Sequence, residues 1–117
     1  MAAGYSVSRL IAANTTNATL VKDKLGTVNG WHLANPAAYA VYLKLYDSAT
    51  IPTAGAGTPK LTIGIPAADA VGINLGSDPN EAIVFTSGIG FTITKLAADA
   101  DTTVVVAGDL IANLYFR

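Results

Sequence analysis

His32 is the only histidine in this sequence, and there is no cysteine. The lack of cysteine excludes a disulfide framework and any zinc or iron–sulfur site built on thiolates. A catalytic histidine would need a nucleophile or a carboxylate placed beside it. A metal-bound histidine would need several further ligands, which only carboxylates could supply here. We therefore interpret His32, which follows Trp31, as an ordinary packed or surface residue.

The eight carboxylates are spread along the chain, and most of them lie where turns are expected, since the Asp side chain bonds the local backbone. The one suggestive group is Asp99, Asp101 and Asp109, but this segment lacks the glycine and the terminal glutamate of a calcium-binding EF-hand loop. Gly88 and Gly90 form a G-x-G pattern with no third glycine opening a helix, so no phosphate loop is indicated. The sequence predicts no catalytic residue, no metal site and no cofactor, and we expect the protein not to be an enzyme.

Tyr42, Lys44 and Tyr46 form the remaining candidate site. They alternate with Leu43 and Leu45, so all three are expected on the outward face of one strand. The strand rise places the two tyrosines about 13 Å apart, with the lysine between them. Tyrosine is enriched at interfaces because it combines a large apolar area with a polar end. This face is the candidate interface, for a subunit or a sugar; a solvated strand face with cross-strand partners is the alternative.

Period-two alternation of apolar residues recurs through the chain and predicts short β-strands. The strongest runs cover residues 39–46, 60–65, 71–76, 89–94 and 110–117, and weaker ones cover residues 6–12, 18–22 and 27–33. Single helical turns are the most that residues 78–81 and 96–100 indicate. About eight strands without helices between them predict an all-β protein with one antiparallel β-sandwich, a jelly roll or a related Greek key.

The sandwich is expected to be a single domain over residues 1–117, with residues 1–5 as an N-terminal arm because they show no alternation. One face of the alternating strands should pack between the two sheets. The residues assigned to that core are Leu43, Leu45, Ile63, Ile65, Ile73, Phe91 and Ile93.

Charge is scarce: 13% of the residues are charged and 51% are apolar, against roughly 25% charged in ordinary soluble domains. The net charge is −1 and the seven basic residues are scattered, so the concentrated basic face of a nucleic-acid-binding protein is missing. No apolar run is long enough for a membrane helix, and no signal peptide is indicated. So little charge predicts that much of the surface is covered by other subunits, in a homo-oligomer for which a trimer is expected.

Five segments together resemble a known class of proteins. They are NTTNAT (residues 14–19), YLKLY (42–46), PKLTIGIP (59–66), GIGFTIT (88–94) and NLYF (113–116). They are similar to segments of small β-sandwich proteins encoded among the virion genes of tailed bacteriophages.

That resemblance implies a head decoration, or cement, protein, made in the host cytoplasm and located on the capsid surface of the virion. Its partner would be the major capsid protein, whose lattice it would stabilise. The family supplies no catalytic residues. The alternative function is a carbohydrate- or receptor-binding module of a phage tail or fibre, with Tyr42, Tyr46 or Trp31 as stacking surfaces.

Overall fold

The computed structural model describes residues 4–78 and 80–117, and these residues form nine β-strands and no helix. The strands are β1 (Ser6–Ile11), β2 (Thr19–Lys22), β3 (Gly26–Asn35), β4 (Val41–Asp47), β5 (Leu61–Ile65), β6 (Asp69–Asn74), β7 (Ile83–Phe85), β8 (Ile89–Thr94) and β9 (Ile111–Phe116). Within the described ranges there is accordingly no helix that could span a membrane. The predicted all-β class is confirmed.

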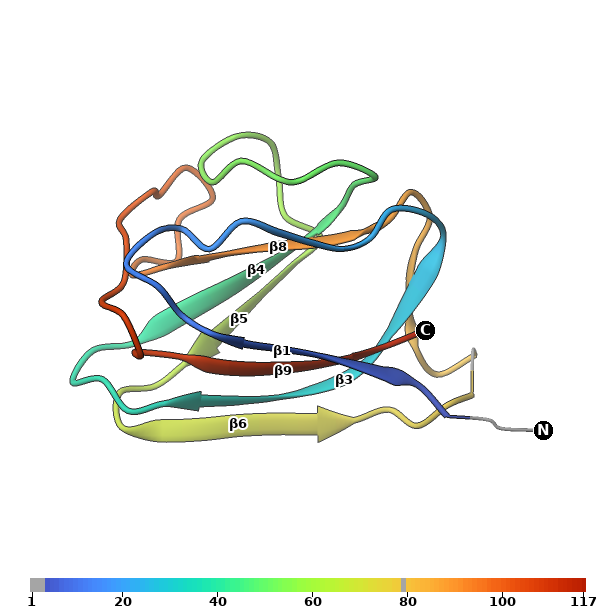
Figure 1. Cartoon of the computed structure of the whole chain (residues 1–117), viewed down its shortest axis with the longest axis horizontal. Coiled ribbons are helices and arrows are strands. Elements are labelled where there is room, and N and C mark those ends of the chain that lie inside the picture. Colours follow the sequence, from blue (N-terminus) through green and yellow to red (C-terminus); the bar gives the residue numbers. More distant parts are fainter. Residues whose placement is uncertain (1–3, 79) are drawn as a thin grey trace.

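The strands form two antiparallel sheets packed face to face (Figure 1). One sheet has the order β1-β9-β3-β6, with the short β7 also pairing with β3, and the other has the order β2-β8-β4-β5. With β7 set aside, β1 pairs with the last strand, β2 with the one before it, β3 with β6, and β4 with β5. This nesting of outer pairs around inner pairs is the jelly-roll topology, so the predicted sandwich is confirmed in its specific form.

One local feature differs from the sequence-based expectations, and two segments expected to form at most single turns do so. The strand β7 was missed, because three residues are too few for alternation to be recognised. Residues 80 and 81 lie in a turn in which Glu81 N–H donates to the Asp78 carbonyl at 3.1 Å, and Pro79 lies outside the described residues. Residues 96–100 form bends and a turn, in agreement with the expectation of at most a single turn.

An N-terminal arm was expected over residues 1–5, and residues 1–3 of it lie outside the described residues. Tyr5, which is described, stacks on Tyr115 of β9, with the ring centroids 5.4 Å apart. This contact attaches the start of β1 to the neighbouring strand.

The core lies between the two sheets, and six of the seven residues assigned to it from the sequence are buried there. The exception is Ile73, which is 45% exposed, so its assignment was wrong. Its strand, β6, is at the edge of its sheet, where Ile73 pairs with the half-buried Trp31 of β3. Alternation identifies the face on which a residue lies, but not whether the opposite sheet extends far enough to cover it.

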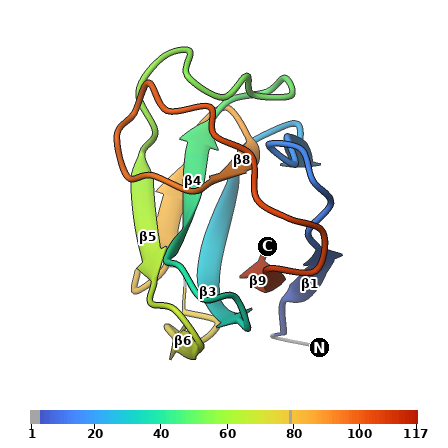
Figure 2. The same cartoon turned by 90° about the vertical axis from the view of Figure 1, so that its left-hand side faces the viewer.

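Two long connections cover one side of the sandwich (Figure 2). We call residues 48–60, between β4 and β5, and residues 95–110, between β8 and β9, the roof. The two connections touch each other, since a Cβ atom at Gly55 would lie 2.7 Å from Thr102 Cγ2. They also touch the sheet below, where a Cβ atom at Gly90 would lie 2.7 Å from Pro52 Cδ. The roof therefore covers the outer faces of β4 and β8.

The packing of the core predicts a contrast between two large-to-small substitutions. Phe91→Ala should lower the free energy of unfolding by about 3–5 kcal/mol, because Phe91 is 2% exposed and its removal leaves a cavity. Ile73→Ala is the control and should cost under about 1 kcal/mol. Urea unfolding of both variants measures the difference; equal costs would contradict the assigned register.

Candidate functional site

The roof changes the character of the candidate face formed by Tyr42, Lys44 and Tyr46. All three point away from the core, opposite to Leu43 and Leu45, as the alternation predicts. The expectation that all three face outward into reach of a partner was nevertheless wrong. Lys44 is fully buried and Tyr46 is 6% exposed, because the roof lies over them. Tyr42 is the one of the three that stays partly accessible to solvent. A binding role therefore remains a prediction for Tyr42 alone.

Lys44 instead connects the sheet to the roof. Its Nζ donates a hydrogen bond of 2.5 Å to the carbonyl of Ala98. Around it the outward residues of β8, Thr92 and Thr94, are also fully buried, and the hydroxyls of Thr92 and Tyr46 lie 3.4 Å apart. The result is a polar layer enclosed between the sheet and the roof.

The outer face of the β1-β9-β3-β6 sheet lies on the other side of the sandwich, away from the roof (Figure 1). We call it the bare face. Its residues, identified from the strand register as those opposite the core positions, are Val7, Arg9, Ile11, Gly30, His32, Ala34, Ala70, Gly72, Asn74, Ile111, Asn113 and Tyr115. Val7 is 56% and Ile11 51% exposed, and Arg9 is the one Lys, Arg, Asp or Glu residue of the set.

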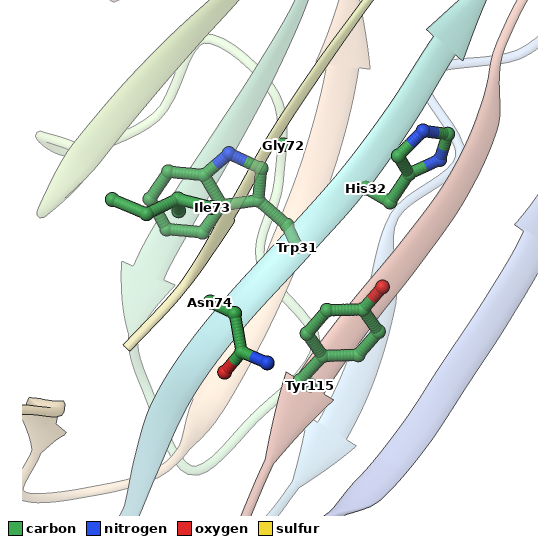
Figure 3. Close-up of a pocket in the computed structure, with 6 residues that line it drawn as sticks. All are labelled: Trp31, His32, Gly72, Ile73, Asn74 and Tyr115. Carbon is green, nitrogen blue, oxygen red and sulfur yellow. The ribbon is translucent and has the colours of Figure 1, made fainter. Parts of the chain in front are cut away.

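A shallow hollow of about 430 Å³ lies over β3, β6 and β9 and includes part of the bare face. Of its lining residues, His32 and Tyr115 lie apart from Trp31 and Ile73, which lie together (Figure 3). Tyr115 lies over Gly30, whose φ of 145° and close approach to the Ile73 carbonyl leave no room for a Cβ atom.

The hollow brings no carboxylate to His32, so the structure assembles no acid–base pair there. Across the described ranges, 4–78 and 80–117, no three His, Asp or Glu side chains are grouped so that they could hold a metal ion.

The acidic group suggested by the sequence is divided among separate structural roles. Asp101 accepts hydrogen bonds from Leu96 N–H and from the Thr103 hydroxyl. Asp109 accepts a hydrogen bond from the Tyr39 hydroxyl. Burial raises the pKa of Tyr39 most, and this hydrogen bond raises it further. Burial opposes ionisation of Asp101, but its hydrogen bonds and the charge of Lys44 outweigh this and hold its pKa below the ordinary value.

Asp47, at the end of β4, fixes the connection between β7 and β8. Its carboxylate accepts hydrogen bonds from the Thr86 hydroxyl and from the N–H groups of Thr86, Ser87 and Gly88. Burial acts to raise its pKa, but these hydrogen bonds stabilise the ionised form more, so the pKa is lowered. Asp47 is thus a structural acceptor.

A second cleft, of about 340 Å³, lies where β4 begins and β8 ends. It is lined by Tyr39, Ala40, Tyr42, Lys95, Leu96 and Ala97. The Lys95 ammonium lies 4.1 Å from the centroid of the Tyr39 ring, a cation–π contact. Tyr42 was among the residues predicted from the sequence, but Tyr39 and Lys95 were missed as a pair, because they are distant from each other in the sequence and meet only in the folded chain.

Asn35 positions the Tyr39 side of this cleft and was also missed. It is 2% exposed, and its side-chain amide donates to the carbonyls of Tyr39, Ile65 and Pro66. The sequence signal was the pair Asn35-Pro36, which predicted a turn without indicating these distant partners.

Comparisons with known proteins add nothing to the fold assignment, which rests on the strand pairing. No family model and no curated protein matches the chain. Among solved structures, the coat protein of tobacco streak virus is similar with a TM-score of 0.40 and 9% sequence identity, over 97% of this chain and 85% of that one. A likeness this weak carries no argument about function.

The buried position of Lys44 predicts that its packing matters more than its charge. Lys44→Ala should cost about 2–4 kcal/mol of unfolding free energy, because it empties the space beneath the roof. Lys44→Met fills that space without a buried charge and should stay within about 1 kcal/mol of the original. Chemical denaturation compares them; equal losses in the two variants would mean that the hydrogen bond to Ala98 is the main contribution.

The shifted pKa values predict how stability depends on pH. The folded pKa values of Asp47 and Asp101 are lowered, so their contribution is present above the ordinary carboxyl pKa of about 4 and is lost as the pH falls through the folded values. Tyr39 has a raised pKa, so its contribution is present below about pH 10 and is lost as the pH rises through the folded value. Unfolding free energies measured across the pH range should therefore fall at both ends.

Asp47→Asn tests the predicted loss of stability at acid pH, since it removes one of the two carboxylates with a lowered pKa, Asp47 and Asp101. Its difference in stability from the original protein should narrow as the pH falls below 4. Parallel stability curves for the two proteins at acid pH would show that Asp47 does not contribute to this loss.

Proposed function

We propose that this chain is a virion structural protein that decorates a phage head, with its bare face docked on the lattice of the major capsid protein. The observation that carries the proposal is the near absence of charge on that exposed face. Arg9 is the only Lys, Arg, Asp or Glu among the residues assigned to it.

The chemistry of the bare face favours burial against protein. Charged groups lose hydration when an interface forms, and interface cores are accordingly depleted of charge. Val7 and Ile11 lie on the same face of β1 and expose more than half of their surfaces. Covering them removes apolar area from water, while few charged groups have to be desolvated.

The mode of action follows from selective binding. A protein that binds the assembled lattice and not the free capsid subunits lowers the free energy of the assembled state. This action needs no catalytic step and no cofactor. The proposal includes a trimer on the shell, since the sparse charge of the whole chain favours contacts between copies as well as with the lattice.

A receptor- or carbohydrate-binding module of a tail or fibre is the second candidate function. The observation that favours it is the cleft containing Tyr42, which offers aromatic surface at a hollow. The two functions place the chain differently in the particle. A reconstruction with density at the capsid three-fold positions supports decoration, and density confined to the tail tip supports the second candidate.

Docking through the bare face predicts the outcome of one matched pair of substitutions. Ile11→Glu places a carboxylate within the proposed contact, at an exposed apolar position of the edge strand β1, and should weaken binding to heads assembled without this protein at least tenfold. Ile51→Glu is the control, because Ile51 is 62% exposed but belongs to the roof. Co-sedimentation with the heads measures copies bound, and thermal melting checks that both variants fold.

The same heads report on stabilisation. Those carrying the original protein or Ile51→Glu should retain their genome on heating, and those given Ile11→Glu should release it. Undiminished binding of Ile11→Glu, or an equal loss with Ile51→Glu, would contradict docking through the bare face.

A further inference from the structure

The cleft beside the roof differs in chemistry from the bare face and lies over the other sheet. Tyr42 forms one wall, with its ring packed over Gly64 of β5; a Cβ atom at Gly64 would lie 3.0 Å from the ring. Tyr39 and Lys95 line it from the loop before β4 and the segment after β8, and Leu96, which is 57% exposed, completes the rim. At about 340 Å³ the cleft falls within the range typical of small-molecule sites.

Few polar groups are available to a ligand in this cleft. The Tyr39 hydroxyl donates to Asp109 and accepts from the Val106 N–H at 3.1 Å, so it is already engaged on both sides. The remaining polar side-chain groups of the lining are the Lys95 ammonium and the Tyr42 hydroxyl. No carboxylate or amide side chain is among the lining residues, so the cleft offers a charged donor but no strong acceptor.

This donor set selects for a ligand rich in acceptors. A neutral sugar presents only hydroxyls, so it offers the Lys95 ammonium no charge-assisted partner. A carboxylate is purely an acceptor and forms a charge-assisted hydrogen bond with an ammonium group, roughly twice as strong as a neutral one. The Tyr42 ring meanwhile supplies a flat apolar surface in the same cleft.

We propose that the cleft binds a carboxylate-bearing pyranose, such as a hexuronate unit of an acidic polysaccharide. The sugar ring lies against Tyr42 and its carboxylate accepts from Lys95. The proposal gives a ligand class to the second candidate function. It does not depend on docking through the bare face, because the two surfaces belong to different sheets. On a particle with the bare face against the shell, this cleft would remain open to solvent.

The test is binding of trigalacturonate to the full chain, measured by calorimetry and by changes in amide chemical shifts. The matched probe is the same oligosaccharide with its carboxylates methyl-esterified, which keeps the rings and removes the charge. Saturable binding of the acid, with shifts concentrated in residues 39–42 and 95–97 and at least tenfold weaker binding of the ester, is expected. Equal binding of acid and ester, or no saturable binding of the acid, would overturn the proposal.

Lysine substitutions separate this site from general charge attraction. Lys95→Gln should weaken binding of the acid at least tenfold, and Lys95→Arg should retain it within about threefold because the positive charge remains. Lys60→Gln is the matched control: the Lys60 ammonium also lies over an aromatic ring, 5.6 Å from the centroid of Phe85, but outside the cleft. Equal weakening by Lys95→Gln and Lys60→Gln would overturn the assignment to the cleft.

Discussion

Burial of β8 on both faces is the constraint that organises the outside of this molecule. On the inner face, Ile89, Phe91 and Ile93 join the core between the sheets, as in any sandwich. On the outer face, Thr92 and Thr94 are just as completely buried, because the roof lies over them. An enclosed polar layer is stable only when its groups find partners, and no buried side-chain polar atom in the described residues lacks one. Lys44 meets this condition by bonding the carbonyl of Ala98 in the roof.

The roof makes the two sides of the sandwich chemically different. One sheet is covered by its own connections, and the cleft at the margin of that cover collects Tyr39, Tyr42 and Lys95. The other sheet presents an open, almost uncharged surface with Val7 and Ile11 exposed. The proposed attachment and the proposed ligand binding would therefore use different sheets of one small domain.

Much of the fold could be read from alternation, because a side-chain period of two belongs to strands and a half-buried strand displays it directly. Leu43, Leu45 and Phe91 were assigned to the core in this way and are buried there. The failures share a cause. In both, the alternation gave the correct face of the strand but not what covers that face. Ile73 alternates like a core residue, but it lies on an edge strand that the facing sheet does not cover. Lys44 alternates like a solvated residue, but the roof covers it.

By itself, the sequence determined the all-β class, the sandwich, most of the core and the scarcity of charge, because these depend on local periodicity and composition. Only the tertiary structure decided the jelly-roll order of the strands, the path of residues 48–60 and 95–110 across one sheet, and hence which outward face is buried and which is bare. Those outcomes depend on contacts such as Lys44 with Ala98 and Asn35 with Ile65, between residues far apart in the chain. Local patterns carry no record of such partners, so the candidate interface could be placed on a strand face but not on the outside of the molecule.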